Sequence, residues 1–320
     1  MLCTGLGFSV LTRISTVRRN RGELHLAAAE NHWLKRLFKK QGRPSGPFLV
    51  DHYLLTPEFQ AVQVGLKPAL RSIFPNRAIS EIRERCERLG LYAVFSDFDV
   101  METPGGVKRL AGRRRAGFCY GYIAPALESA VGLKDLEARA GRPDAALDRE
   151  MGERLGYPLC CVDFFLSRRD LPSGRFLLET ARHTAGPFLA ELNPFASRLL
   201  VSHIPCSFHC PASLKYARTL LSRLRLDPPE AETWLVSAEG GRLRLTADPE
   251  SETFRFSPDP TGISDGYSSG PSWWRELCKA LRAGSLLRVD GESLIFDRPP
   301  LPPARIEGRF ERWALLCFQA

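Results

Sequence analysis

Two cysteine pairs, each beside a proline, constrain this chain more than any other feature of its sequence. Cys160 and Cys161 are adjacent, and Cys206 and Cys210 form the second pair, 45 residues further along. Proline suits the first turn of a helix, where its missing N–H loses no hydrogen bond, so each pair is predicted to lie where a helix begins. Four thiols in two sharply turned segments are what a metal ion, an iron–sulfur cluster or a redox dithiol needs.

A helix start favours the reactive form of cysteine. The unpaired N–H groups and the positive end of the helix dipole face the side chains there, and both stabilise thiolate over thiol. Thiolate is the form that binds iron or zinc, and it is also the form that attacks disulfides.

The spacing of the cysteines favours an iron–sulfur cluster over zinc. Adjacent side chains on a helix diverge by about 100°, so Cys160 and Cys161 suit two irons of a cluster better than one tetrahedral ion. Cys206 and Cys210 are four residues apart, which brings both sulfurs to one side if the segment is helical. Only this second pair fits the usual zinc spacing. We therefore expect a cluster of the 4Fe-4S type, with zinc as the alternative, and a cysteine that does not ligate would be free to react.

Other polar residues flank the cysteines or precede them. His203 and His209 are predicted to be alternative ligands or to donate hydrogen bonds to the ligands, and the competing interpretation is a capping or surface role. Arg113, Arg114 and Arg115 are weaker candidates for anchoring an anionic substrate, with a solvated loop as the alternative.

The two cysteine motifs together resemble those of a prokaryotic family of uncharacterised function found in archaea and bacteria. The first motif is LGYPxCCVxFF at 155–165, and the second is HxPCSxxCxxS at 203–213. The resemblance covers roughly residues 90–225 and supports the position of a site, but it implies no reaction. Adjacent cysteines with a second pair are also similar, by analogy only, to iron–sulfur reductases that act on nucleosides or disulfides.

Composition bounds the class of protein. A chain of 320 residues favours two domains, and 44% hydrophobic with 25% charged residues is typical of a globular protein. The nine cysteines are odd in number and unevenly spaced, which argues against a secreted disulfide framework. No apolar run approaches the roughly 20 residues that span a bilayer, and no signal peptide is recognised, so we expect a cytoplasmic protein.

The pattern along the chain predicts a mixed α+β fold. Residues 1–44 are expected to form a basic, partly disordered arm with an amphipathic helix over about 24–40. A helix-rich α/β domain carrying the four cysteines should span 45–228, and a smaller β-rich domain should span 229–320. The arm holds +7 of the net charge of +9, which suits nucleic acid or an anionic surface, and equally a solvated leader.

Turn residues and periodicity place the individual elements. Helices are predicted over 79–89, 144–155, 214–226 and 273–281, several of them with glycine at the end. Strands are predicted over 91–96, 118–123 and 313–318, with a hairpin over 286–297 that turns at Asp290-Gly291. The prolines at 299, 300, 302 and 303 are interpreted as a stiff link.

Three functional hypotheses follow from the sequence. The first is an iron–sulfur protein that handles electrons or sulfur on a small anionic molecule or an RNA base, served by an electron donor protein. The second is a zinc-stabilised nucleic-acid-binding or interaction module, whose basic arm contacts phosphates. The third is a metal-free dithiol redox protein, which the lack of a C-x-x-C motif disfavours.

Overall fold

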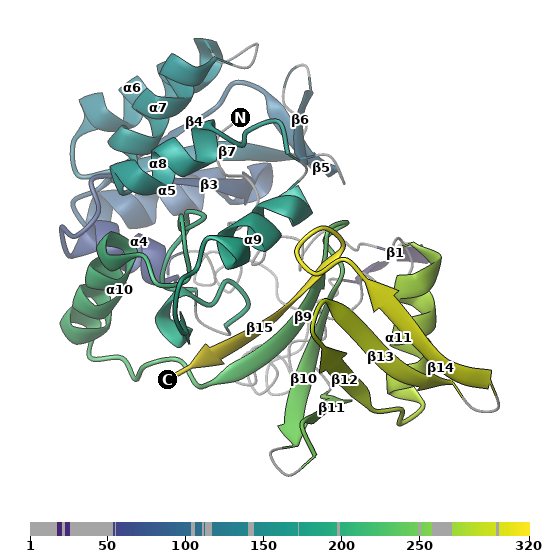
Figure 1. Cartoon of the computed structure of the whole chain (residues 1–320). Coiled ribbons are helices and arrows are strands. Elements are labelled where there is room, and N and C mark those ends of the chain that lie inside the picture. The colour runs from purple at the N-terminus through teal and green to yellow at the C-terminus, as the bar shows by residue number, and fades with distance from the viewer. Residues whose placement is uncertain are drawn as a thin grey trace.

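The fold combines helices with two large sheets, which confirms the mixed α+β class (Figure 1). The computed structural model describes residues 18–20, 23–25, 54, 56–103, 106–110, 112, 117–139, 144–171, 173–196, 199–248, 251–257, 271–298 and 301–320. Most of the basic arm therefore lies outside the described residues. Within it, β1 (Arg18–Asn20) and β2 (Glu23–His25) pair antiparallel. The helix expected over about 24–40 lies outside the described part except for its first two positions, which are in β2.

An antiparallel sheet forms the centre of the first half of the molecule. Its strands run in the order β3-β7-β5-β6, and β4 also pairs with β7. The central strand β7 carries alternating aromatic and small residues over residues 118–122. A side chain at Gly121 of this strand would collide with Phe74 and Phe95. The five strands are β3 (Leu70–Pro75), β4 (Tyr92–Phe95), β5 (Asp99–Thr103), β6 (Gly106–Leu110) and β7 (Phe118–Ala124).

Helices pack around this sheet and complete its hydrophobic core. The helix α7 begins at its N-cap Asp144, whose carboxylate accepts from two N–H groups, and the chain leaves it through Gly156 at φ 74°. That tight exit leads directly into α8, which carries the first cysteine pair. The helices of this half are α4 (Pro57–Gln63), α5 (Ile79–Arg88), α6 (Leu127–Arg139), α7 (Ala145–Arg154) and α8 (Leu159–Leu166).

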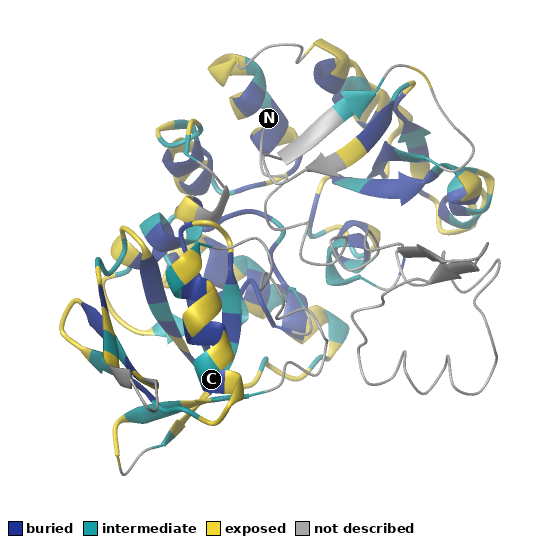
Figure 2. Ribbon diagram, turned by 90° about the vertical axis from the view of Figure 1, so that its right-hand side faces the viewer, coloured by how far each residue is buried: buried dark blue, intermediate teal, exposed yellow. Residues whose placement is uncertain are grey.

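A second sheet occupies the C-terminal part of the molecule, with strands in the order β14-β13-β12-β11-β10-β9-β15-β8. All neighbours are antiparallel except β15 and β8. The helix α11 (Ser272–Arg282) packs its buried face on this sheet and leaves the other face exposed, as the colours in Figure 2 show. The strands are β8 (Phe188–Leu189), β9 (Glu232–Ser237), β10 (Arg242–Asp248), β11 (Thr253–Phe256), β12 (Leu287–Asp290), β13 (Ser293–Arg298), β14 (Leu301–Glu307) and β15 (Trp313–Gln319).

Two helices connect the halves. A separate core joins α9 (Ser173–Arg182) and α10 (Pro211–Leu224) to β9 and β15. The strand β8 precedes the expected boundary at 228/229 and yet pairs with β15 of the C-terminal sheet. The cysteine region is therefore packed against both sheets.

The proline-rich link expected near residues 299–303 is wrong for its second half, because Pro302 and Pro303 lie within β14. Among the described strands, this one is the outermost of its sheet, and one side of its backbone has no partner strand there. Successive residues of a strand direct their N–H groups to opposite sides, so the open edge accommodates one of the two prolines. The irregular pairing with β13 between Phe296 and Arg298 accommodates the other. The expected helices 79–89, 144–155, 214–226 and 273–281 and the hairpin at Asp290-Gly291 are confirmed, with boundaries shifted by a few residues.

Candidate metal centre

Cys160 and Cys161 lie in the first turn of α8, as the sequence predicts. Pro158 is the N-cap of this helix, with φ −57° and ψ 133°. The turn lies close to the body of the protein, and Gly156 permits this approach because a Cβ there would lie 2.5 Å from the Pro68 side chain. Gly152 of α7 similarly lets Val162 of α8 approach, since a Cβ there would lie 2.8 Å from a Val162 methyl group.

The second pair lies in an irregular segment that ends at α10. Cys210 is the N-cap of α10, with φ −61° and ψ 115°, and Pro211 is the first helical residue. The segment between Cys206 and Cys210 is a turn rather than a helix, so the helical premise for this pair is wrong. The Cys210 N–H instead donates to the Ser207 carbonyl at 3.1 Å.

The helix α9 and the residues directly after it fix the position of this turn. The Thr180 hydroxyl, fully buried, donates to the Pro205 carbonyl at 3.1 Å. The Phe208 N–H donates to the Thr184 hydroxyl at 2.9 Å. Phe208 lies between Cys206 and Cys210 in the sequence, and its ring is fully buried. These bonds hold Cys206 toward α8.

The four sulfurs converge on one point. The Sγ atoms of Cys160 and Cys161 are 3.9 Å apart, and they lie 3.7 Å and 3.6 Å from Cys210 Sγ. Cys206 completes the group, in which all four sulfurs lie within 4.8 Å of one another. Each of the four cysteines is free of a disulfide bond. This quartet could hold a metal ion.

The adjacent pair does not diverge as far as ideal helix geometry suggests. The Sγ atoms of Cys160 and Cys161 are 3.9 Å apart, so the divergence of neighbouring helical side chains does not by itself favour two irons over one ion. Four sulfurs bound at about 2.3 Å around one tetrahedral zinc ion stand about 3.8 Å apart. The three separations between Cys160, Cys161 and Cys210 lie within 0.2 Å of that spacing.

Burial differs sharply among the four sulfur ligands. Cys161 and Cys210 are buried, Cys206 is intermediate, and Cys160 is exposed. Leu159, the residue before Cys160, is also 57% exposed. The quartet therefore lies at the surface, with one thiol reachable from solvent and two within the protein.

Hydrogen bonds surround the buried sulfurs. Cys161 Sγ accepts from the Cys206 N–H at 3.4 Å and lies 3.4 Å from the Ser213 hydroxyl. Ser213 is fully buried one turn into α10, and its hydroxyl is 2.8 Å from His203 Nε2. Ser213 is the last residue of the second cysteine motif, but the sequence alone does not indicate its contact with the Cys161 sulfur.

Protonation within the quartet is uneven. Hydrogen bonds from Cys161 and Cys206 lower the pKa of Cys210 far below its usual range. Hydrogen bonding with Cys206 and Cys210 raises the pKa of Cys161, and the pKa of Cys206 is raised to about 12. The negative charge of one thiolate disfavours the formation of a second thiolate beside it. Four thiolates at this spacing therefore require a bound cation to offset their charge.

His203 lies behind the sulfurs. It is buried, its ring lies 5.2 Å from the Tyr157 ring, and its Nε2 meets Ser213. Burial, together with the nearby Lys67 ammonium, lowers the pKa of His203 to about 3. The ring is therefore neutral near pH 7 and orients Ser213 rather than carrying charge. Lys67, which gave no signal in the sequence, is itself buried and ion-paired with Glu58.

The other predicted site residues are placed differently. His209 is exposed, and neither histidine belongs to the group of converging ligand atoms. Arg113, Arg114 and Arg115 lie outside the described residues. Their role as substrate anchors stays a prediction.

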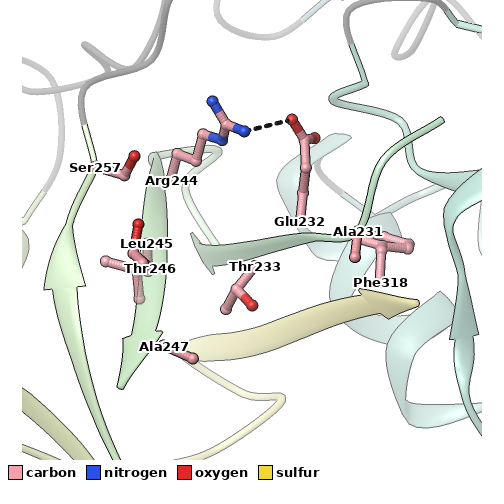
Figure 3. Close-up of a pocket in the computed structure, with 9 residues that line it drawn as sticks. All are labelled: Ala231, Glu232, Thr233, Arg244, Leu245, Thr246, Ala247, Ser257 and Phe318. Atoms are coloured by element: carbon pink, nitrogen blue, oxygen red, sulfur yellow. Dashed lines mark ion pairs between the residues drawn. The ribbon is translucent and has the colours of Figure 1, made fainter. Parts of the chain in front are cut away.

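A pocket with a volume of about 220 Å³ lies on the C-terminal sheet (Figure 3). Arg244 and Glu232 form an ion pair of 3.1 Å at its wall. The carboxylate of Glu232 also accepts from Asn193 at 2.8 Å and from Trp234 at 3.0 Å, so it is fully engaged by the protein. The lining residues are Ala231, Glu232, Thr233, Arg244, Leu245, Thr246, Ala247, Ser257 and Phe318.

Comparison with known proteins adds no relative. No family model, no curated protein and no solved structure matches this chain. Among the described helices, none combines the length and the apolar character that crossing a bilayer demands.

Proposed function

We propose that this chain binds one zinc ion through the thiolates of Cys160, Cys161, Cys206 and Cys210, and that the ion stabilises the fold. The observation that carries the proposal is the spacing of the sulfurs, 3.6 to 3.9 Å for the three pairs with the closest contacts. That spacing is the edge of a tetrahedron around a single ion. The chemistry of four thiolates selects zinc or iron over calcium and magnesium.

The iron–sulfur cluster remains the competing assignment. In a cubane each cysteine binds a different iron, so its sulfurs must stand farther apart than around one ion, with inorganic sulfide between the irons. The quartet would have to open to admit such a cluster. The argument from adjacent cysteines no longer favours it, because Cys160 and Cys161 both point to the same centre.

The proposed ion has a structural role. Four protein ligands close the coordination shell, whereas catalytic zinc sites keep one position for water or substrate. The ion would fasten the start of α8 to the start of α10. Val162, Phe164 and Phe165 of α8 belong to the core of the first sheet, and Cys210 belongs to the core shared with β9 and β15. A bound ion thus stabilises the junction of the two cores.

Binding of another molecule is the activity proposed for this zinc-stabilised frame, with nucleic acid as the partner. The support is the charge of +7 in residues 1–44, since clustered Lys and Arg release counterions on contact with phosphates. Affinity for a single-stranded RNA oligomer should fall steeply with salt. A chain lacking residues 1–44 should bind at least about tenfold more weakly at low salt, and equal binding would exclude the arm as the contact.

Metal and acid-labile sulfide analysis tests the metal assignment. The protein is purified without oxygen as wild type, Cys160→Ser, Cys210→Ser and, as the matched control, Cys317→Ser, which changes an exposed cysteine on β15. We expect about one zinc and no sulfide in the wild type and the control, with reduced zinc in the other two variants. Iron with sulfide, lost in those two variants, would replace the proposal with a cluster.

A further inference from the structure

We propose that Cys160 is the oxidation site of this centre, where its thiolate attacks a hydroperoxide, and that Cys210 then closes a disulfide with it and expels the ion. This inference rests on the proposed zinc site and adds a modification that the stabilising role does not require. It assigns different fates to four chemically identical ligands.

Exposure selects the first sulfur to react. Cys160 is the exposed member of the quartet, while Cys161 is 2% exposed and Cys210 fully buried. A hydroperoxide must reach the sulfur along the line of its O–O bond, so a buried thiolate reacts slowly whatever its charge. Cys206, half-buried, is the next most accessible ligand.

Hydrogen bonding points to the same residue. Cys161 Sγ accepts from the Cys206 N–H and contacts the Ser213 hydroxyl, each at 3.4 Å. Within the described part of the chain, the hydrogen-bonding contacts of Cys160 Sγ are those with the sulfurs of Cys161 and Cys210 alone, and none is with an N–H or hydroxyl group. A hydrogen bond draws electron density from a thiolate and slows its attack, so Cys160 keeps the most nucleophilic sulfur.

The identity of the resolving cysteine follows from chain geometry. Cα atoms of adjacent residues are about 3.8 Å apart across a trans peptide, short of the roughly 4.4–6.8 Å that a disulfide spans. Cys160 and Cys161 therefore cannot join while α8 stays helical. Cys210 lies on a different helix, and its Sγ is 3.7 Å from Cys160 Sγ. It can close the bond by a small movement of the two helix starts.

The reaction balances in two steps. The Cys160 thiolate attacks one oxygen of hydrogen peroxide, the O–O bond breaks, and the departing hydroxide takes a proton, giving sulfenic acid and one water. The Cys210 thiolate then attacks the Cys160 sulfur, and the hydroxyl group leaves with a proton as a second water. Two thiolates lose two electrons, the peroxide gains them, and the ion keeps two ligands at most and dissociates.

The test uses the full chain loaded with zinc, whose metal content is measured first. Hydrogen peroxide is added at about one equivalent, zinc release is followed with a chromogenic chelator, and tryptic peptides are mapped by mass spectrometry. Cys160 lies in the peptide 155–168 and Cys210 in the peptide 199–215. We expect a cross-link of these two peptides, with Cys160 and Cys210 identified by fragmentation, that forms as zinc leaves.

Two variants sharpen the result. Cys160→His keeps a zinc ligand without a thiol and should release zinc about tenfold more slowly, whereas Cys317→Ser should match the wild type. A disulfide within peptide 199–215 as the first product, or equal release from Cys160→His, would overturn the inference while leaving the zinc site intact. A protein that holds no zinc before oxidation would instead overturn the proposed function.

Discussion

Two buried polar residues, His203 and Ser213, lie behind the cysteines and contact each other. Ser213 stands between His203 and Cys161, at 2.8 Å from the ring nitrogen and 3.4 Å from the sulfur. A neutral histidine can accept from the hydroxyl or donate to it, so Ser213 can match the protonation state of the sulfur. This arrangement orients a ligand without contributing one.

Replacement of His203 by glutamine should remove a pH dependence of stability. Burial lowers the pKa of His203 to about 3, against about 6.5 in the unfolded chain. As the pH falls below about 6.5, the unfolded chain takes up a proton that the folded chain refuses, so the stability that His203 contributes is present above that pH and lost below it. Between pH 7.5 and 5.0 the wild type should lose about 2 kcal/mol more free energy of unfolding than His203→Gln.

Urea unfolding at the two pH values measures this difference. Protonation of the cysteine ligands affects wild type and variant alike, so it cancels in the comparison. Equal losses in the two proteins would show that His203 is protonated in the folded state and that its burial does not hold it neutral.

At the scale of elements, close helix packing determines where the first cysteine pair lies. Gly152 on α7 faces Val162 on α8, and the two helices meet without space for a methyl group. Gly132 on α6 differs, because a Cβ there would meet only the flexible end of the Arg154 side chain. The two glycines therefore predict opposite results for the same substitution.

Gly152→Ala should lower the free energy of unfolding by about 1–3 kcal/mol, because the added methyl group overpacks the α7–α8 contact. It should also weaken zinc binding, since α8 moves with Val162. Gly132→Ala should instead raise stability by up to about 1 kcal/mol through helix propensity. Thermal unfolding and zinc titration of both variants check this, and a stable Gly152→Ala protein with full zinc affinity would refute the packing argument.

The elements that the sequence predicted well are those with strong end signals. Asp144 and Gly156 bound α7, and Gly90 ends α5, because an N-cap carboxylate and a left-handed glycine satisfy backbone groups locally. The helix α6 was missed, with Gly132 at its middle. The strand β14 was read as a link because its prolines suggest no strand until its edge position is known.

The cysteine site was predicted only in part, and the reason is physical. Local rules predicted both pairs at helix starts, and the structure confirms this for Cys160, Cys161 and Cys210, whereas Cys206 lies in the turn before α10. The side-chain directions at Cys160 and Cys161, and the turn between Cys206 and Cys210, depend on tertiary contacts such as those from Thr180 to Pro205. Sequence spacing therefore identified the quartet but not the separation of its sulfurs, on which the proposal of one ion rather than a cluster rests.

On the scale of the whole molecule, the cysteine quartet is joined to the C-terminal sheet by aromatic packing. The ring of Phe208, between the second pair of cysteines, lies 5.1 Å from Phe318 on β15 and 5.2 Å from Phe188 on β8. Phe318 also lines the pocket on that sheet. The segment that carries two of the ligands is thus part of the core that holds β15 in place.

Removal of the ion should therefore destabilise more than the cysteine segment. Chelation of zinc under reducing conditions should lower the melting temperature, and near-ultraviolet circular dichroism should report lost packing around the buried Trp234 of β9. Phe208→Ala should uncouple zinc removal from the packing of the C-terminal sheet. It should also lower the free energy of unfolding by about 3–5 kcal/mol. Unchanged thermal unfolding after complete removal of zinc would contradict a stabilising role for the ion.

X-ray absorption at the metal edge of the anaerobically purified protein tests the central claim most directly, since it measures what surrounds the metal. The account predicts zinc with four sulfur neighbours at about 2.3 Å and no second metal nearby. An iron edge with a neighbouring iron in the scattering would contradict it, and would show that the four sulfurs separate around a cluster.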